Sequence, residues 1–289
     1  MTFNATGSVV AHIRSHLASL IPTEQAVALV LIDRPDAVIE MSSQQVAAAA
    51  GTSRATVVRA CQSLGFTGYQ QLRVMLARDL GPAGAASSDG TAAEEQTTLA
   101  GTVRASFAGV GTALPAMTAL LDDEDLNAAV RTLADARRVL VCGNGLSGPL
   151  AQLAAHRLLT LDRSVDAPAD TITQQIVARH MTPEDALLAI SGSGANEITA
   201  RCATVAHEAG ATVVLVTAFR RSPLVAVADV SLVVGMRDPT FRDELTVTTR
   251  IPQLILIEGL VAGVARRRGK DARAALAAAL DVVAGNLAE

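Results

Sequence analysis

The sequence predicts an all-α N-terminal domain joined to an α/β domain, in which helices cover both faces of a parallel sheet as a three-layer sandwich. Three observations carry this prediction. The first 80 residues show helical periodicity, the part after residue 137 alternates short β-branched runs with helical stretches, and a Gly-, Ala- and Ser-rich stretch separates the two. The 289 residues are enough for two domains of this kind.

The stretch between the two parts reads as a flexible linker. "GPAGAASSDGTAA" (residues 81–93) has neither helical nor strand periodicity. The charge balance also changes here, because residues 1–80 hold six arginines against five acidic residues, whereas the remainder holds 18 basic against 23 acidic residues. We therefore expect domains over residues 1–80 and 96–289, with residues 81–95 as the linker.

Before the linker, apolar residues recur every three or four positions, which predicts a run of short helices. These helices are expected over His12–Leu20, Glu24–Asp33, Ser43–Ala50, Ser53–Leu64 and Tyr69–Leu80.

Within this run, "SSQQVAAAAGTSRATVVRACQSLGF" (residues 42–66) has the pattern of a helix-turn-helix. Gly51 suits the left-handed backbone of a tight turn, and Ser53 is a favourable N-cap for the second helix. The side chains of that helix expected to face the core are Val57, Val58, Cys61 and Leu64. Its other side would then enter a major groove of DNA.

The residues expected to contact DNA lie at the start of the second helix, on its exposed side and on the helix that follows. Base edges are usually read from the N-terminal end of such a helix, and arginines neutralise phosphates. The expected contacts are Thr52, Ser53, Arg54, Thr56, Arg59 and Arg73, with Gln62 also exposed. The alternative is a helical hairpin with no DNA role. The small local charge suits DNA binding only if two copies bind together.

After the linker, a long helical stretch over residues 94–136, interrupted near Pro115, leads into the alternating part. Strands are expected at "RVLVCG" (138–143), "ALLAIS" (186–191), "ATVVLVTA" (211–218) and "DVSLVVG" (229–235), and helices at Pro149–Leu161, Glu197–Ala209, Leu245–Arg267 and Asp271–Asn286. Short apolar strands alternating with helices are typical of a parallel sheet that is covered on both faces.

Two of these strands end in similar loops, "GNGLSG" (143–148) and "SGSGANE" (191–197). Ligands of open parallel sheets bind beyond the carboxyl ends of the strands, and glycines and helix N-termini favour phosphate groups there. An uncharged, hydroxyl-rich cradle suits a phosphate monoester on a polyol. The expected ligand-binding residues are Gly143, Asn144, Gly145, Ser147, Ser191, Gly192, Ser193, Gly194, Asn196 and Glu197.

Two other kinds of glycine-rich loop fit these sequences less well. "GNGLSG" resembles the dinucleotide pattern G-x-G-x-x-G only loosely, since Ser147 stands before the last Gly. No acidic residue about 20 positions on clearly ends a second strand, Asp166 being a weak candidate. No Gly-Lys-Ser/Thr is present, so neither loop is a P-loop. The remaining alternative is a pair of tight turns without a ligand.

Composition narrows the class of protein. A net charge of −4 gives no global field that attracts nucleic acid. Cys61, Cys142 and Cys202 lack metal-ligand spacing and suit a reducing cytoplasm. The N-terminus has no signal-peptide pattern, and no apolar run reaches the roughly 18–20 residues that cross a bilayer. We therefore expect a cytoplasmic protein without cofactor, metal or membrane partner.

Taken together, the two halves resemble RpiR/MurR-type transcriptional regulators, which join a helix-turn-helix domain to a sugar isomerase (SIS) domain. The resemblance covers nearly the whole chain. It rests on residues 41–77 in the first half and, in the second, on "GNGLS", "ISGSGANEI", "AHEAGATVVLVT", "SPLVAVADV" and "TTRIPQLILIEGL".

The resemblance implies that the SIS domain senses a phosphosugar, with Ser147 on the sugar phosphate and Ser191, Ser193 and residue 196 on the phosphate group. The sequence departs from the family pattern Ser-His-Ser-Gly-x-Thr, because Gly192 replaces the His and Asn196 replaces the Thr. Ile172 also lies where the family often has His. These departures put the identity of the effector in doubt.

The sequence thus favours a regulator of sugar or amino-sugar metabolism that binds DNA as a homo-oligomer, either a dimer or a tetramer, and is not an enzyme. The alternative is a sugar-phosphate isomerase, for which Glu197 is the candidate base. Glu197 equally suits the first turn of a helix, where it complements the dipole. A scaffold without a ligand would leave the serine loops unexplained.

Overall fold

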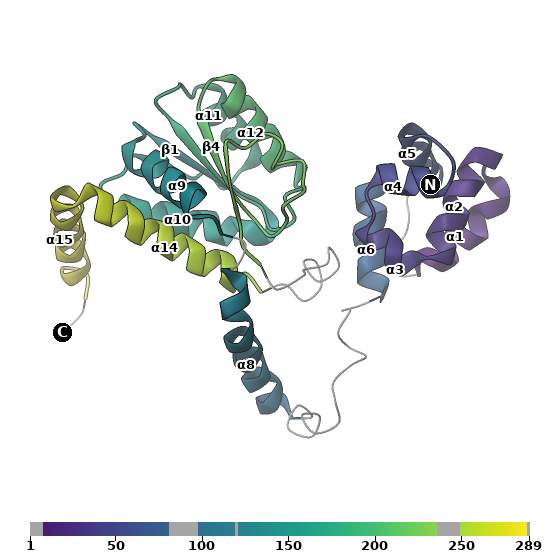
Figure 1. Cartoon of the computed structure of the whole chain (residues 1–289), viewed down its shortest axis with the longest axis horizontal. Coiled ribbons are helices and arrows are strands. Elements are labelled where there is room, and N and C mark those ends of the chain that lie inside the picture. The colour runs from purple at the N-terminus through teal and green to yellow at the C-terminus, as the bar shows by residue number, and fades with distance from the viewer. Residues whose placement is uncertain (1–7, 81–97, 119–120, 236–248, 288–289) are drawn as a thin grey trace. The chain divides into compact units, whose positions relative to one another are not determined.

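The computed structural model describes residues 8–80, 98–118, 121–235 and 249–287 (Figure 1). The chain divides into two compact units, and the division falls between Thr102 and Val103, inside helix α8 (Leu99–Met117). The predicted linker over residues 81–95 lies outside the described residues, so its flexibility stays a prediction.

The N-terminal unit consists of short helices, as predicted. They are α1 (Val9–His16), the 3₁₀ turn η1 (Leu17–Ser19), α2 (Pro22–Asp33), α3 (Pro35–Glu40), α4 (Ser43–Ala49), α5 (Arg54–Ser63) and α6 (Tyr69–Leu80). Helix α3 was not expected from the sequence. This helix has only six residues and begins directly after α2, with Pro35 in its first turn, where the missing N–H costs nothing.

The core of this unit is built mainly from Val, Leu, Ile and Ala, with Phe66 and Tyr69 as its large aromatic side chains. The Tyr69 hydroxyl donates to the carbonyl oxygens of Val38 (2.7 Å) and Met41 (3.0 Å), which ties α6 to the end of α3. Helix α5 packs against α2 and α4, so its position is fixed from two sides.

The C-terminal unit alternates strands and helices. Its strands are β1 (Val139–Gly143), β2 (Val165–Asp166), β3 (Ala186–Ile190), β4 (Thr212–Thr217) and β5 (Val230–Val233). Its helices are α9 (Asp123–Asp135), η2 (Gly145–Ser147), α10 (Gly148–Leu159), α11 (Thr171–Arg179), α12 (Glu197–Glu208), α14 (Ile251–Arg268) and α15 (Lys270–Ala284), with α8 preceding them.

The five strands form one parallel sheet in the order β2-β1-β3-β4-β5. Alternate strand residues point to opposite faces. On one face Val141 and Ile190 pack with residues of α9, α10 and α14, and on the other Leu140 and Leu187 pack with α11 and α12. The predicted three-layer α/β fold is therefore confirmed.

Helix α8 ends at Met117 and α9 begins at Asp123, so the expected interruption near Pro115 is confirmed. Helix α14 begins at Ile251, and the expected start at Leu245 lies outside the described residues, so that start stays a prediction. Strand β2 and helix α11 were not predicted, because two strand residues and a nine-residue helix give weak periodicity. In the described ranges, no helix is long and apolar enough to cross a membrane.

Candidate functional site

The two serine-glycine loops lie next to each other at the carboxyl edge of the sheet. Strands β1 and β3 are hydrogen-bonded neighbours, and their last residues, Gly143 and Ile190, are paired. The loops that start at Asn144 and Ser191 therefore leave the sheet side by side. Both loops expected to bind a ligand therefore leave the same edge of the sheet, on neighbouring strands.

The loop after β1 folds back tightly on the strand. A Cβ added at Gly143 would lie 2.6 Å from the carbonyl oxygen of Ser147, so only glycine fits there. The Ser147 N–H donates to the carbonyl oxygen of Asn144 (3.2 Å) in the turn η2. This turn leaves Ser147 nearly buried at the entrance to α10, a helix whose first turn has no capping side chain.

The loop after β3 is held against β4. The carbonyl oxygen of Gly192 accepts from the Thr217 hydroxyl (3.1 Å) and from the Ala218 N–H (2.9 Å). Gly194 has φ +60°, and a Cβ at this position would lie 2.2 Å from the Ser222 hydroxyl oxygen. Gly194 therefore allows both the left-handed turn and the close approach of Ser222.

A buried hydrogen-bond network joins the two loops. The Asn144 side-chain amide donates to Thr199 Oγ1 (3.0 Å) and to Gln174 Oε1 (3.1 Å). The Thr199 hydroxyl donates in turn to Asn196 Oδ1 (3.1 Å), which also accepts the Thr199 N–H as the N-cap of α12. Thr199 and Gln174 are almost completely buried. The network fixes the positions of β1, α11 and α12 relative to one another.

Sequence reasoning missed Gln174, Thr199 and Ser222. Gln174 lies on a helix that was not predicted, and Thr199 and Ser222 carry no local signal that separates them from other polar residues. Their roles follow from tertiary contacts alone.

Two hydroxyl groups at this edge remain available. Within the part of the chain that the structure describes, the side chains of Ser147 and Ser191 have no hydrogen-bond partner. Both residues are nearly buried, at 5% and 3% exposed, yet their hydroxyl oxygens are not sealed from solvent. Ser193 is half-buried, and its oxygen accepts from the Ala195 N–H (3.3 Å). Neutral donors of this kind suit an anionic group.

Glu197 lies on the exposed surface of α12. Its carboxylate is exposed and forms an i,i+4 ion pair with Arg201 on the surface of α12. Asn196 uses its Oδ1 for the helix cap, so its Nδ2 is the group that can donate to a ligand. Ile172 is 68% exposed at the start of α11, where the Asp170 carboxylate caps the helix.

The weak candidate for dinucleotide binding, Asp166, does end strand β2 beside β1. In the sheet, Asp166 is paired with Leu140, which lies three residues before the end of β1. The Asp166 carboxylate lies 3.6 Å from the guanidinium of Arg138. The carboxylate is therefore directed toward the start of β1 and away from the loop of residues 143–148. Among the described residues, no group of three or more His, Cys, Asp or Glu side chains could hold a metal.

The helix-turn-helix pattern in the N-terminal unit forms as expected. Gly51 has φ +63° in the turn between α4 and α5. The Ser53 oxygen accepts the Thr56 N–H (3.2 Å) at the start of α5. Ser42 and Gln45 form a reciprocal capping box at the start of α4 (2.7 and 3.2 Å).

Arg54, Arg59 and Gln62 lie on the exposed side of α5, as the sequence predicts. Arg59 donates to Thr56 Oγ1 (3.1 Å), which holds the guanidinium along the helix surface. Ser53 is exposed, whereas Thr52 is half-buried and its Oγ1 is enclosed, with no hydrogen-bond partner among the described residues. The exposed residues of this set can reach a nucleic acid, and the contacts of all of them with DNA stay a prediction.

Two expectations for side chains of α5 and α6 are wrong. Thr56 was expected on the exposed side but is 6% exposed, because its hydroxyl faces Ser53 Oγ (2.9 Å) inside the cap. Arg73 was expected to neutralise a phosphate, but it is 9% exposed and its Nε donates to the carbonyl oxygen of Ile39. Burial lowers the pKa of the Arg73 guanidinium from its usual value. Arg73 therefore belongs to the buried core of the N-terminal unit.

Val58, which was expected in the core, is half-buried.

Known proteins share both halves of this arrangement. The helix-turn-helix domain of the rpiR family matches residues 7–83, and the SIS domain matches residues 132–261. The HTH-type transcriptional regulator HexR of Pseudomonas aeruginosa is 33% identical over 259 residues, covering 90% of each chain. An uncharacterized HTH-type transcriptional regulator of Caldanaerobacter subterraneus is 30% identical over 263 residues, covering 91% of this chain and 92% of that protein.

The fold is also that of a solved structure, the Vibrio vulnificus NanR protein complexed with ManNAc-6P. The two structures superpose with a TM-score of 0.74 at 22% sequence identity, over 97% of this chain and 100% of that chain.

Proposed function

The chain belongs to the rpiR family of helix-turn-helix transcriptional regulators that carry a SIS domain, and we propose that a phosphorylated sugar bound beyond β1 and β3 controls its affinity for DNA. As a regulator of chromosomal DNA, it is proposed to act in the cytoplasm and to serve sugar or amino-sugar metabolism.

The observation that carries this proposal is the pair of serine hydroxyls at the carboxyl edge of the sheet. Ser147 and Ser191 follow adjacent strands, are nearly buried, and have no hydrogen-bond partner among the described residues. Both hydroxyl oxygens still reach solvent, so a phosphate group that enters at this edge can accept a hydrogen bond from each of them. The N-terminus of α10 adds a positive dipole end beside Ser147.

The roles proposed for the other residues follow from their positions in the two loops. The backbones of Gly143, Gly145, Gly192 and Gly194 line the cradle, Ser193 and Asn196 Nδ2 donate to the phosphate, and Asn144 orients the two loops. Glu197 is proposed to complement the dipole of α12 without touching the ligand, because its carboxylate is paired with Arg201. The NanR complex with ManNAc-6P supports a phosphosugar as the class of ligand.

The proposed mechanism is thermodynamic linkage. A sugar phosphate that binds two arrangements of the protein unequally shifts their populations, and the two arrangements hold the DNA-reading helices differently. The residues proposed to read or contact DNA are Thr52, Ser53, Arg54 and Arg59. Because one helix-turn-helix reads one half-site, a palindromic operator requires two copies, so we propose a homo-oligomer.

The competing function is a sugar-phosphate isomerase. Aldose–ketose isomerisation needs a base beside the sugar carbons C1 and C2. The exposed ion pair of Glu197 with Arg201 does not favour Glu197 in that role. The regulator names of the relatives also support a protein that senses the sugar phosphate without converting it.

The test is selection of genomic DNA fragments by the purified full chain, at moderate salt, with and without a panel of hexose, pentose and amino-sugar phosphates. We expect one palindromic site to be enriched and one phosphate to change the enrichment. The variant carrying both Ser147→Ala and Ser191→Ala should select the same site but ignore the phosphate. Salt-sensitive retention without sequence preference would contradict DNA regulation, and turnover of a panel member would favour the isomerase.

A further inference from the structure

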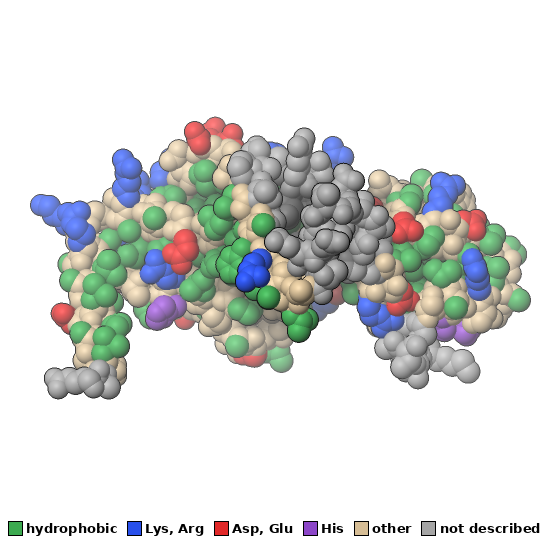
Figure 2. All heavy atoms as spheres, turned by 90° about the horizontal axis from the view of Figure 1, so that it is seen from below, with side chains coloured by type: hydrophobic (Ala, Val, Ile, Leu, Met, Phe, Trp, Pro, Cys, Tyr) green, Lys and Arg blue, Asp and Glu red, His purple; other side chains and the backbone are tan. Residues whose placement is uncertain are grey.

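Gln253 is a buried polar residue on a helix face that is otherwise apolar. It lies in the first turn of α14 and is 2% exposed. At 100° per residue, it lies on the same side of α14 as Ile257 and Leu260, which belong to the apolar core on this face of the sheet. Charged side chains of the C-terminal unit stand out on its surface in Figure 2, whereas Gln253 is turned inward.

The amide of Gln253 has no hydrogen-bond partner among the described residues. Its Oε1 is enclosed without a partner, whereas its Nε2 is not enclosed. Rotation about the last side-chain bond exchanges these two atoms, so either of them can take the outer position. Burying an amide oxygen without a partner is unfavourable. The amide is therefore suited to a partner that comes from outside the chain.

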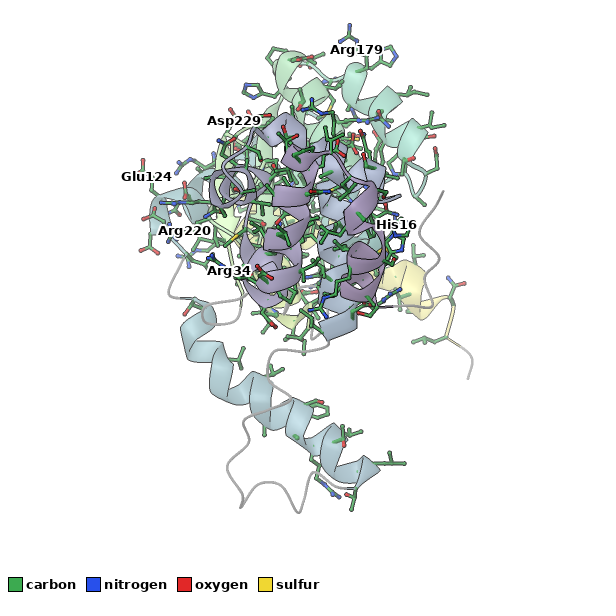
Figure 3. All side chains as sticks on the ribbon, turned by 90° about the vertical axis from the view of Figure 1, so that its right-hand side faces the viewer. His16, Arg34, Glu124, Arg179, Arg220 and Asp229 are labelled. Atoms are coloured by element: carbon green, nitrogen blue, oxygen red, sulfur yellow. The ribbon has the colours of Figure 1, made fainter. Side chains whose placement is uncertain are left out.

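The first turn of α14 lies at the carboxyl edge of the sheet. Pro252 and Val234 line the same apolar groove, and Val234 directly follows β5. The Val234 N–H also donates to the carbonyl oxygen of Thr217 (2.8 Å), the last residue of β4. Figure 3 marks both edges of the sheet, with Asp229 before β5 at the amino edge and Arg220 after β4 at the carboxyl edge.

Helix α10 begins at the same edge and lies beside α14 (Figure 1), so the two helices run in the same direction. An ion pair between Arg157 and Glu258 joins them (2.9 Å). Counting back along both helices from this pair brings Gln253 level with the second turn of α10. Because α10 starts at Gly148, directly after Ser147, Gln253 lies at the end of the unit that carries the serine loops.

The packing of α14 directs Gln253 toward β3. Helix α14 contacts both α9 and α10, and each of these two helices contacts β3. On the same side of α14 as Gln253, Ile257 belongs to the apolar core that contains Ile190, the last residue of β3. Ser191 follows Ile190 and begins the second serine loop. Gln253 therefore faces the end of the strand from which Ser191 leaves.

We propose that Gln253 is a specificity-determining residue of the effector site, whose amide binds a hydroxyl group of the sugar while Ser147 and Ser191 bind the phosphate. An ionised phosphate oxygen only accepts hydrogen bonds, whereas the amide both donates and accepts, as a sugar hydroxyl does. A site that bonds a hydroxyl discriminates strongly against a ligand that lacks it. The effector class is accordingly a polyhydroxylated phosphate monoester. The inference rests on the proposed function, because it concerns the same sugar phosphate.

The test is calorimetric binding of the panel of hexose, pentose and amino-sugar phosphates, and of inorganic phosphate, to the full chain with Gln253→Met. Methionine keeps the length and the helix propensity of the side chain but removes both polar atoms. For each sugar phosphate that the wild type binds, we expect the dissociation constant to rise at least tenfold. The dissociation constant of inorganic phosphate should stay within about twofold, because phosphate has no sugar hydroxyl to lose.

Gln175→Met is the matched control. Gln175 of α11 is half-buried, and its amide donates to the Thr171 carbonyl oxygen of its own helix (2.9 Å). This variant should bind the sugar phosphates and inorganic phosphate like the wild type.

Thermal melting without ligand separates a ligand contact from a structural one. Because the Gln253 amide has no partner among the described residues, Gln253→Met should melt at or above the wild-type temperature. A lower melting temperature, unchanged sugar-phosphate binding, or an equal loss for inorganic phosphate would each overturn this inference and leave the proposed function in place. A folded wild type that binds no member of the panel would overturn both.

Discussion

The side-chain amide of Asn144 donates a hydrogen bond to Oγ1 of Thr199, at 3.0 Å and across 55 positions of sequence. The first residue belongs to the loop after β1 and the second to the first turn of α12, after the loop from β3. Because Thr199 also donates to the cap residue Asn196, a shift of either loop is transmitted to the other. This contact joins the two loops into one hydrogen-bonded unit.

Removing the Thr199 hydroxyl should loosen that site. Thr199→Val keeps the side-chain shape but leaves the amide of Asn144 and the oxygen of Asn196 each short of a partner. We expect a loss of about 1–3 kcal/mol in the free energy of unfolding, measured by urea denaturation, together with weaker sugar-phosphate binding. Thr160→Val is the control, since the Thr160 hydroxyl bonds only the nearby Arg157 carbonyl oxygen (2.7 Å). Equal losses in the two variants would argue against a special role for the network.

A side chain at position 194, in the loop after β3, should lower the free energy of unfolding. Gly194 and Gly145 have almost the same φ, +60° and +58°, but only the first has Ser222 in the space of its Cβ. Gly145→Ala should cost about 1–2 kcal/mol from backbone strain alone. Gly194→Ala should cost about 1–3 kcal/mol more, because Ser222 and its segment must move. Similar melting temperatures for the two alanine variants would show that the close contact of Ser222 is unimportant.

Two arginines of the N-terminal unit should behave differently when replaced. Arg59→Ala should weaken DNA binding and reduce the salt dependence of the affinity by about one counterion, with little effect on stability. Arg73→Met should destabilise the unit by about 1–3 kcal/mol, because the carbonyl oxygen of Ile39 loses a buried donor. Fluorescence anisotropy at several salt concentrations and thermal melting distinguish the two effects. A stable Arg73→Met protein with a reduced salt slope would contradict this assignment.

Lowering the pH should destabilise helix α11, because the carboxylate of its N-cap residue, Asp170, becomes protonated. Hydrogen bonds from Thr173 and from the N–H of Ile172 lower the pKa of Asp170 below its usual range. A carboxyl whose pKa is lower in the folded state adds stability above its unfolded pKa of about 3.9, and that stability is lost as the pH falls through the folded pKa. Asp170→Asn keeps an N-cap that does not titrate. Its stability below pH 4 should therefore fall less steeply than that of the wild type, and identical pH profiles would contradict the role of Asp170.

Local sequence patterns were enough to predict most of the helices and strands of this protein. The Gly51 turn with its Ser53 cap, and the glycine-serine loops after two apolar strands, depend on near neighbours in sequence. Their backbones form as expected. The parallel order of the strands also follows from the alternation of strands with helices.

What sequence patterns could not show depends on contacts between distant segments. Arg73 looks like a surface arginine in the sequence, yet a carbonyl oxygen 34 positions away draws it into the core. Thr56 sits at an exposed position of the helical wheel, but the cap at Ser53 encloses it.

The most direct test of the account is linkage between the two ligands. The dissociation constant of the sugar phosphate that changes DNA selection is measured by calorimetry, for the full chain alone and bound to its operator. We predict that the two constants differ by the same factor by which the sugar phosphate changes the affinity for the operator, and that Ser147→Ala with Ser191→Ala abolishes the binding. Equal dissociation constants with and without the operator would show that the site beyond β1 and β3 does not control DNA binding.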